Sequence, residues 1–295
     1  MVGTEEELCR FARRVNRPFR KEIFAAAGKL LFPLILKMAT NQLHNDPGYG
    51  YKISIEGEKN IPKNRTLIFI APHQTHQDVK TILVALSGLT GRLVSVLNAV
   101  DGGSTRSDWR SLQLTRATPI VRINPDSELV KQQRQTVKPT MAQNAQGGID
   151  QLVFSEGTYC PGFNDMWRLW SGGIDVADET SATIVPLMLV YGTDDNGMVQ
   201  HAALRIIEPF KYDEYGGARL AAAGLRDIMI EHKKAMNAIH NPGATQSDYS
   251  GFRKAQSKIF YWDPDYKEGY KYSLDYHLAK TDRERQQIEN KCQDF

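Results

Sequence analysis

The sequence predicts a single α/β domain in which a mixed, mostly parallel sheet is flanked by helices. From residue 50 onward, short apolar runs alternate with segments of helical periodicity, as expected where helices connect parallel strands. The 295 residues, 41% of them hydrophobic, are enough for one sizeable core. The chain has no internal repeat and no linker rich in Ser, Gly or Pro, and a fibrous or wholly disordered protein is excluded.

Each expected strand is a short apolar run bounded by turn residues, and each expected helix is a segment with apolar residues three and four positions apart. In chain order the strands are 51–56, 66–71, 93–98, 118–123, 151–155, 183–191 and 201–208. The helices are 78–88, 107–116, 127–146, 173–179 and 213–240. Together they form a catalytic domain over residues 49–245, with an extension at each end.

The first extension, residues 1–48, is a basic amphipathic segment. Between Arg10 and Lys37, eight basic residues stand against one acidic residue, Glu22, and apolar residues recur at helical spacing. Such a helix can lie among lipid headgroups, where each basic side chain contributes about 1 kcal/mol against anionic lipid. It can equally cover the protein core and leave its basic face in water. We expect the segment to hold the domain to the cytosolic face of a membrane.

The second extension, residues 246–295, mixes aromatic residues with charges, and a predicted turn from Asn241 to Gly251, with Pro242, Gly243 and Gly251, leads into it. Its aromatic residues include Tyr249, Phe252, Phe260, Tyr261, Trp262, Tyr266, Tyr270, Tyr272 and Tyr276. We expect these rings to pack over the edge of the domain, with contact to a ligand or lipid as the alternative.

Composition narrows the classes of partner and the compartment. The formal net charge is +3, which is not the balance of a nucleic-acid-binding protein. Cys9, Cys160 and Cys292 lie far apart, without the paired spacings of a zinc site or a disulfide framework, and this favours a reducing compartment. The chain has neither a signal-peptide pattern nor an apolar run of about 18 residues. We expect a cytoplasmic protein that is peripherally associated with a membrane face.

Two histidines and an aspartate follow the apolar strand at 66–71. The strand stops at Pro72, and His73, His76 and Asp78 precede the next helix. In open α/β sheets, ligands bind outside the carboxyl ends of the strands. An aspartate five residues after a histidine can reach one ring nitrogen across such a turn. It would fix the tautomer and leave the other nitrogen to take a proton from a hydroxyl.

A second apolar strand, 151–155, also ends in a small polar turn that contains glycine. With both turns considered, the sequence resembles the glycerolipid acyltransferase family, the glycerol-3-phosphate and lysophosphatidic acid acyltransferases. The first motif of that family, a histidine and an aspartate separated by four residues, matches His73 and Asp78. The resemblance covers roughly residues 50 to 210, and its four motifs occur in the order that the family has.

The other three motifs are matched in part. The third, Phe-Pro-Glu-Gly-Thr-Arg, corresponds to Phe154, Glu156, Gly157 and Thr158, with Ser155 in place of the proline and Tyr159 in place of the arginine. The second is similar to Pro119, Ile120 and Arg122, with Arg116 where the family usually has glycine. The fourth is similar to Ile184-Val185-Pro186-Leu187.

The resemblance implies transfer of a fatty acyl group from acyl-CoA or acyl-carrier protein to a hydroxyl of a lysophospholipid or glycerol-3-phosphate. His73 would be the general base on the acceptor, oriented by Asp78, with direct attack on the thioester and no acyl-enzyme. The acyl donor is a co-substrate, and neither a metal nor another cofactor is implied. The substrate-binding residues that the resemblance assigns are Arg122, Glu156, Gly157, Thr158 and Tyr159.

Tyr159 occupies the position at which relatives with phosphate-bearing acceptors have an arginine that binds the phosphate. Tyrosine keeps a hydrogen-bond donor but loses the positive charge, and a buried contact of that kind is worth about 2 kcal/mol. Either Arg116 or Arg168 supplies the missing charge, or the acceptor is a non-phosphorylated alcohol or amine. The position of Arg122 suits a phosphate contact and also a salt bridge at a strand end.

Three other interpretations use overlapping residues. The ligands of a metal-dependent hydrolase would be His73, His76 and Asp78, with His201 or Asp194 as a further donor. A thiol acyltransferase would use Cys160 as its nucleophile together with His73. A lipid-binding or scaffold protein would need an idle histidine, and the presence of both His73 and Asp78 argues against it.

Overall fold

A computed structural model of the chain describes residues 5–15, 51–75, 77–92, 94–100, 117–121, 127–157, 160, 162–194 and 199–259. Their strands are β1 (Lys52–Glu56), β2 (Leu67–Ile70), β3 (Val94–Val100), β4 (Thr118–Val121), β5 (Asp150–Val153), β6 (Thr183–Thr193) and β7 (Val199–Ile206). Their α-helices are α1 (Glu5–Val15), α3 (Asp78–Thr90), α5 (Glu128–Gln135), α6 (Val137–Gln146), α7 (Gly172–Thr180), α8 (Ala218–His240) and α9 (Gln246–Ile259). Short 3₁₀ helices are η1 (Glu58–Asn60) and η2 (Tyr212–Glu214).

The strands form one seven-stranded sheet with the order β1-β7-β6-β2-β5-β3-β4. The five strands from β6 to β4 in this order run parallel to one another. β7 is antiparallel to β6 and parallel to β1, so this pair runs the opposite way. The sheet is therefore mixed and mostly parallel, as predicted, and every predicted strand forms within a few residues of its expected bounds.

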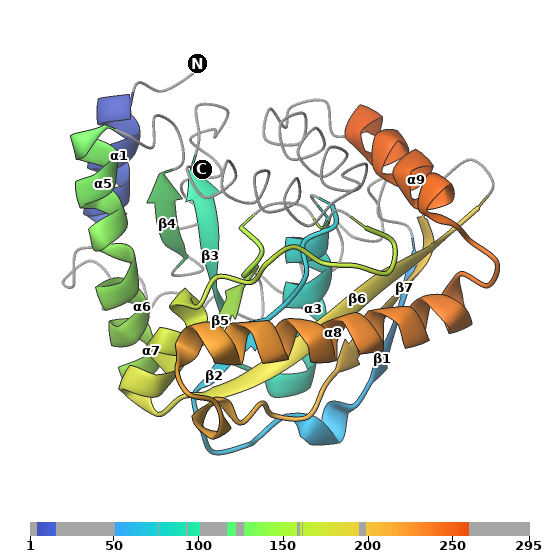
Figure 1. Ribbon diagram of the computed structural model, residues 1–295. Coiled ribbons are helices and arrows are strands. Elements are labelled where there is room, and N and C mark those ends of the chain that lie inside the picture. Colours follow the sequence, from blue (N-terminus) through green and yellow to red (C-terminus); the bar gives the residue numbers. More distant parts are fainter. Residues whose placement is uncertain are drawn as a thin grey trace.

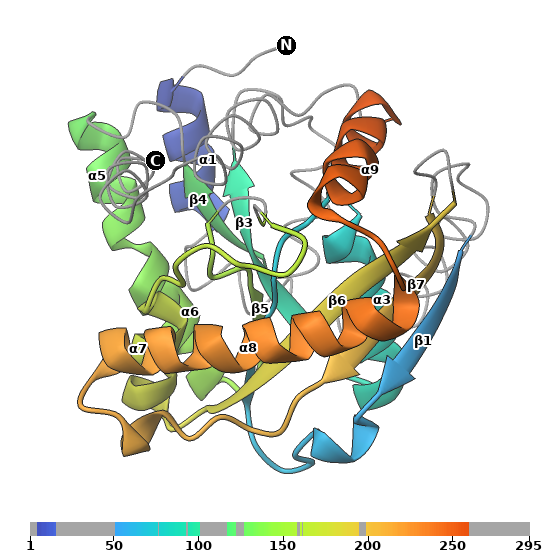
Figure 2. The same cartoon turned by 45° about the vertical axis from the view of Figure 1, so that its right-hand side comes forward.

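Both faces of the sheet are covered, because successive side chains of a strand point to opposite sides. In β2, Ile68 and Ile70 pack with α6, α7 and α8, whereas Leu67 and Phe69 pack with α3. Figures 1 and 2 show α8 running across one face of the sheet, with α3 on the other. Burial on both faces explains why the sequence of β2 is an unbroken apolar run.

The predicted helices form with one division. Those at 78–88, 173–179 and 213–240 appear as α3, α7 and α8, while 127–146 is divided around Thr136 into α5 and α6. Pro139 has no N–H to donate to the carbonyl four residues earlier, and its ring would crowd that carbonyl in a continuous helix. The helix predicted at 107–116 lies outside the described residues.

α9 replaces part of the turn that the sequence predicts from Asn241 to Gly251. The helix begins at Gln246, and its start is capped by Thr245, whose N–H and hydroxyl each donate to Asp248 Oδ2 over 2.7 Å. A threonine followed three residues later by an acid is a signal for a helix start. Pro242 and Gly243, which favour a turn, precede this helix, whereas Gly251 lies within it.

The part of the aromatic extension that the structure describes packs on the domain. Tyr249 and Phe252 of α9 are buried, and Phe252 lies against Tyr191 of β6 with 5.7 Å between ring centroids. The aromatic residues from Phe260 onward lie outside the described residues.

α1 is also part of the core. Its buried residues are Leu8, Cys9, Phe11 and Ala12. They pack against β4 and α5, while Arg10 is exposed and pairs with Glu6. Of the two arrangements given for the basic segment, α1 has the one in which a helix covers the core and leaves its basic face in water. Residues 16–50, and with them the predicted boundary at residue 48, lie outside the described residues.

Candidate active site

His73 and Asp78 meet across the turn that joins β2 to α3. His73 Nδ1 lies 2.9 Å from Asp78 Oδ2. The turn is short, because β2 ends at Ile70 and α3 begins at Asp78 itself. The Asp78 side chain is fully buried, whereas 21% of the His73 side chain is exposed. Part of the imidazole is therefore open to the surface, while the carboxylate stays away from water.

Besides its contact with His73, the Asp78 carboxylate accepts hydrogen bonds from four other groups. The backbone N–H groups of Gln74 and Thr75 donate to Oδ2, the second over 2.8 Å. The hydroxyl groups of Thr75 and Tyr191 donate to Oδ1 over 3.2 and 2.7 Å. Donors arranged in this way stabilise the anion and fix its orientation. The carboxylate can therefore hold the proton of His73 on Nδ1.

A phenylalanine that follows the neighbouring strand β5 packs against the imidazole of His73. Phe154 follows β5, which is next to β2 in the sheet, and its ring lies against His73 with 4.4 Å between centroids at 31°. With Nδ1 turned toward Asp78, Nε2 is the nitrogen that can take a proton from a substrate hydroxyl.

Glu156 lies beside His73 and binds its main chain. Glu156 Oε2 accepts the N–H of His73 over 3.1 Å, and Oε1 accepts the N–H of Trp167 over 2.8 Å. The residue is only 3% exposed. Burial raises the pKa of Glu156 to about 7, although the charge of Lys233 and the two N–H donors act to lower it. Because both oxygens accept backbone N–H groups, Glu156 positions His73, and its contact with an acceptor stays a prediction.

The raised pKa of Glu156 makes the stability of the fold depend on pH. In the unfolded chain this carboxyl has its usual value of 4.5, so the folded protein binds more protons between about pH 4.5 and 7. Its contribution to stability is complete below the lower value and is lost as the pH rises through the upper one. We expect the free energy of unfolding, measured with urea, to change less with pH across this window in Glu156→Gln than in the wild type. The control is Glu179→Gln, whose side chain is 49% exposed, and it should keep the wild-type slope. Equal slopes in all three proteins would contradict this expectation.

Gly157 has no side chain, and this leaves room for the indole of Trp170 beside it. Its φ is +70°, a left-handed conformation that favours glycine, and a Cβ there would lie 2.9 Å from Trp170 Nε1. The backbone N–H of Trp170 donates to the carbonyl of Ser155 over 2.7 Å. Trp170 is 43% exposed, so an apolar surface lies next to the turn that follows β5.

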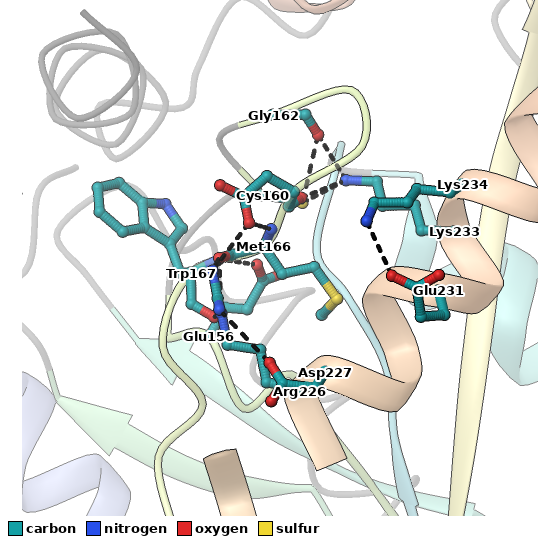
Figure 3. A network of polar contacts seen from close by, with 11 residues as sticks. Glu156, Cys160, Gly162, Met166, Trp167, Arg226, Asp227, Glu231, Lys233 and Lys234 are labelled. Atoms are coloured by element: carbon teal, nitrogen blue, oxygen red, sulfur yellow. Dashed lines mark hydrogen bonds and ion pairs between the residues drawn. The ribbon is translucent and has the colours of Figure 1, made fainter. Parts of the chain in front are cut away.

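A buried lysine of α8 holds the loop that follows this turn. Lys233 Nζ donates to the carbonyl of Gly162 over 2.6 Å and to Cys160 Sγ over 2.7 Å (Figure 3). It also donates to the carbonyl of Asp165 over 2.8 Å. Lys233 and Cys160 are both 0% exposed. The N–H of Cys160 in turn donates to the carbonyl of His73. The main chain of His73 is thus bonded through both its N–H and its C=O.

Two further residues on the same side of α8 bind the 162–167 loop. Arg226 Nε donates to the carbonyls of Met166 and Trp167 over 2.9 and 3.1 Å. Asn237 Nδ2 donates to the carbonyl of Phe163 over 2.6 Å. Residues seven and four positions apart share a helix face, so one face of α8 satisfies a series of loop carbonyls. The loop is thereby fixed to the helix.

The structure brings together four of the residues that the sequence predicts for the site: His73, Asp78, Glu156 and Gly157. The others, Arg122, Thr158 and Tyr159, lie outside the described residues, as does His76. Sequence analysis missed Tyr191 and Lys233. Lys233 had a visible signal, since it lies at the buried helical spacing of Met229 and Met236.

The geometry of the described residues does not support the two other enzyme interpretations, a metal-dependent hydrolase and a thiol acyltransferase. In the part of the chain that the structure describes, no group of three or more His, Cys, Asp or Glu side chains could hold a metal ion. His201 packs against His240, with 5.4 Å between their ring centroids. Cys160 Sγ is buried against Lys233, whereas an attacking nucleophile must meet its substrate.

Comparison with known proteins supports the fold. No protein-family model matches the chain, and a sequence comparison with curated proteins found no match. Among solved structures, the chain is similar to the crystal structure of PlsC, the 1-acyl-sn-glycerophosphate (LPA) acyltransferase from Thermotoga maritima, with a TM-score of 0.53 and 14% identity. The match covers 72% of this chain and 83% of that one. The two chains share a fold. The predicted α/β architecture is confirmed by this likeness together with the strand order described above.

Proposed function

We propose that this chain is an O-acyltransferase that moves a fatty acyl group from acyl-CoA or acyl-carrier protein to a hydroxyl of a lysophospholipid or glycerol-3-phosphate. The observation that carries the proposal is the pairing of a partly exposed His73 with a fully buried Asp78 at the carboxyl end of β2. This edge of an open α/β sheet is where ligands bind. The fold that the chain shares with an LPA acyltransferase supports the same class of reaction.

In the proposed reaction, His73 Nε2 takes the proton of the acceptor hydroxyl while the hydroxyl oxygen attacks the thioester carbonyl carbon. Asp78 stabilises the imidazolium that forms. The C–S bond then breaks, and the imidazolium returns its proton to the departing thiolate. The products are an ester and a free thiol. Because the acceptor attacks directly, the scheme has no acyl-enzyme and needs no metal or bound cofactor.

The acceptor is proposed to bind where the turns after β4 and β5 follow their strands. Arg122 is the proposed contact for an acceptor phosphate, and the exposed Arg168 is a second cation close to the 162–167 loop. Gly157 and Thr158 are proposed to offer backbone N–H groups to an anion. Tyr159 offers a hydroxyl in place of a charge, which is the reason to test acceptors without phosphate.

Attachment to a membrane surface is also part of the proposal. No helix among the described residues is long and apolar enough to cross a bilayer. Because the apolar side of α1 is buried in the core, attachment would depend on residues 16–48, which include Arg17, Arg20 and Lys21. Basic residues of this kind favour anionic lipid.

The test is thiol release from palmitoyl-CoA by the purified protein with glycerol-3-phosphate, lysophosphatidic acid or an unphosphorylated lysolipid mimic. We expect release that depends on the acceptor, with the matching ester detected by mass spectrometry, and faster turnover on anionic than on zwitterionic vesicles. Activity with only the uncharged acceptor would assign the site to a non-phosphorylated alcohol or amine. If no acceptor reacts with either acyl-CoA or acyl-carrier protein, the proposed function is wrong.

A further inference from the structure

A cluster of buried hydroxyl groups lies on the far side of Asp78 from His73. The hydroxyl of Tyr191, near the carboxyl end of β6, donates to Asp78 Oδ1 over 2.7 Å. The hydroxyl of Tyr51 lies 2.6 Å from Thr81 Oγ1, one turn into α3. The two tyrosine rings meet edge to face at 84°, with 5.9 Å between their centroids. None of these groups is placed in the reaction by the steps described above.

We infer that Tyr191 is a positioning residue for acyl transfer: its hydroxyl sets the orientation of the Asp78 carboxylate and how the negative charge is shared between the two carboxylate oxygens. The inference rests on the proposed function for its catalytic meaning. Its geometric part concerns the His73–Asp78 pair alone and can be measured without turnover.

The two carboxylate oxygens have different partners, and this difference supports the inference. Oδ2 faces His73 and the backbone N–H groups of the turn, whereas Oδ1 receives the hydroxyl groups of Thr75 and Tyr191. The bond at Oδ1 fixes the rotation of the carboxylate and so directs Oδ2 toward the imidazole. It also draws negative charge toward Oδ1, which weakens Oδ2 as an acceptor.

Tyr191 is suited to hold this hydrogen bond permanently. Its ring is buried between Tyr51 and Phe252, so its position is set by packing on both sides. Burial, followed by the charge of Asp78, raises the pKa of Tyr191 well above its usual value of 10. The hydroxyl therefore remains a donor at every pH at which the protein would be assayed.

The test is Tyr191→Phe, which keeps the ring and removes only the hydroxyl. Without that donor, the carboxylate is less firmly fixed in rotation, but Thr75 and the N–H groups of the turn still keep Oδ2 beside His73. Negative charge shifts back toward Oδ2, which becomes a stronger acceptor, and the Nδ1–H bond of His73 lengthens. We expect the Nδ1 ¹⁵N resonance of His73, read through its carbon-bound ring protons and assigned by its loss in His73→Ala, to move downfield. In the acyl-transfer assay, kcat should fall about tenfold with little change in KM, and the acid limb of the pH–rate profile should move to higher pH.

The matched control is Tyr212→Phe, which removes a hydroxyl that donates to the carbonyl of Ala177 in α7, on the opposite face of the sheet from α3. It should leave the His73 resonance and the pH–rate profile close to those of the wild type. Equal effects of the two substitutions, or an unmoved His73 resonance in Tyr191→Phe, would overturn the inference. A moved resonance in a protein without acyltransferase activity would uphold the link between Tyr191 and the pair and would count against the proposed function alone.

Discussion

Replacement of His73 by alanine is expected to lower kcat/KM for acyl transfer by about 10³-fold or more. The imidazole is the group in the described site that is both partly exposed and held by a buried carboxylate. Without it, the described part of the site has no such base for the acceptor hydroxyl. The loss should appear in kcat, with the acceptor KM little changed, because the proton is transferred only in the transition state.

Asp78→Asn should cause a loss of about 10²–10⁴-fold while the fold is kept. The amide oxygen can still accept from the N–H of Thr75, and its NH₂ can donate to the hydroxyl oxygen of Tyr191. The shape of the turn is preserved while the charge beside His73 is lost. Since the two residues act as a unit, the double variant should be no slower than His73→Ala.

A histidine outside the site provides the control for these variants. His232→Gln, on α8, should retain wild-type turnover, and all variants should unfold at similar urea concentrations. If His73→Ala kept activity within tenfold of the wild type, or if a chelator abolished wild-type turnover, general-base catalysis by His73 would have to be abandoned.

The part of the site that the sequence predicts is the part that local geometry determines. His73 and Asp78 are five residues apart at the end of an apolar strand, so a single turn brings them together whatever surrounds it. The strands could be predicted for a similar reason, since burial on both faces requires an unbroken apolar run such as that of β2. Their order in the sheet could not, because it depends on contacts between distant segments.

Distant contacts also explain what the sequence analysis missed. Tyr191 is 113 residues from Asp78, and Lys233 is 73 residues from Cys160. Glu156 was predicted as a site residue, but its hydrogen bond to His73 was not. The donor is the backbone N–H of His73, and every residue except proline has such a group, so no pattern of residue types indicates the bond. A polar side chain within an apolar helical face, as at Lys233, indicates a buried partner but does not say which one.

Lys233→Met is expected to lower the free energy of unfolding by about 3 kcal/mol or more. Lys233 is fully buried, and its Nζ donates to the carbonyl of Gly162 (Figure 3) and to that of Asp165. Methionine fills a similar volume but leaves both carbonyls without this donor inside the protein. It also removes the positive charge that acts on the buried Glu156. Urea unfolding at a fixed pH measures the loss.

The adjacent residue offers a control that separates burial from charge. Lys234 also carries a positive charge on α8, but its side chain is 50% exposed and pairs with Glu231 over 2.8 Å (Figure 3). Lys234→Met should change the free energy of unfolding by no more than about 0.5 kcal/mol, because exposed ion pairs contribute little. Lys233→Gln keeps a donor without the charge, so its loss of unfolding free energy should lie between those of the two methionine variants.

Lys233→Met should also reduce turnover, since the 162–167 loop and Cys160 support the main chain of His73. Equal stability of Lys233→Met and Lys234→Met would show that the buried amine does not hold the loop.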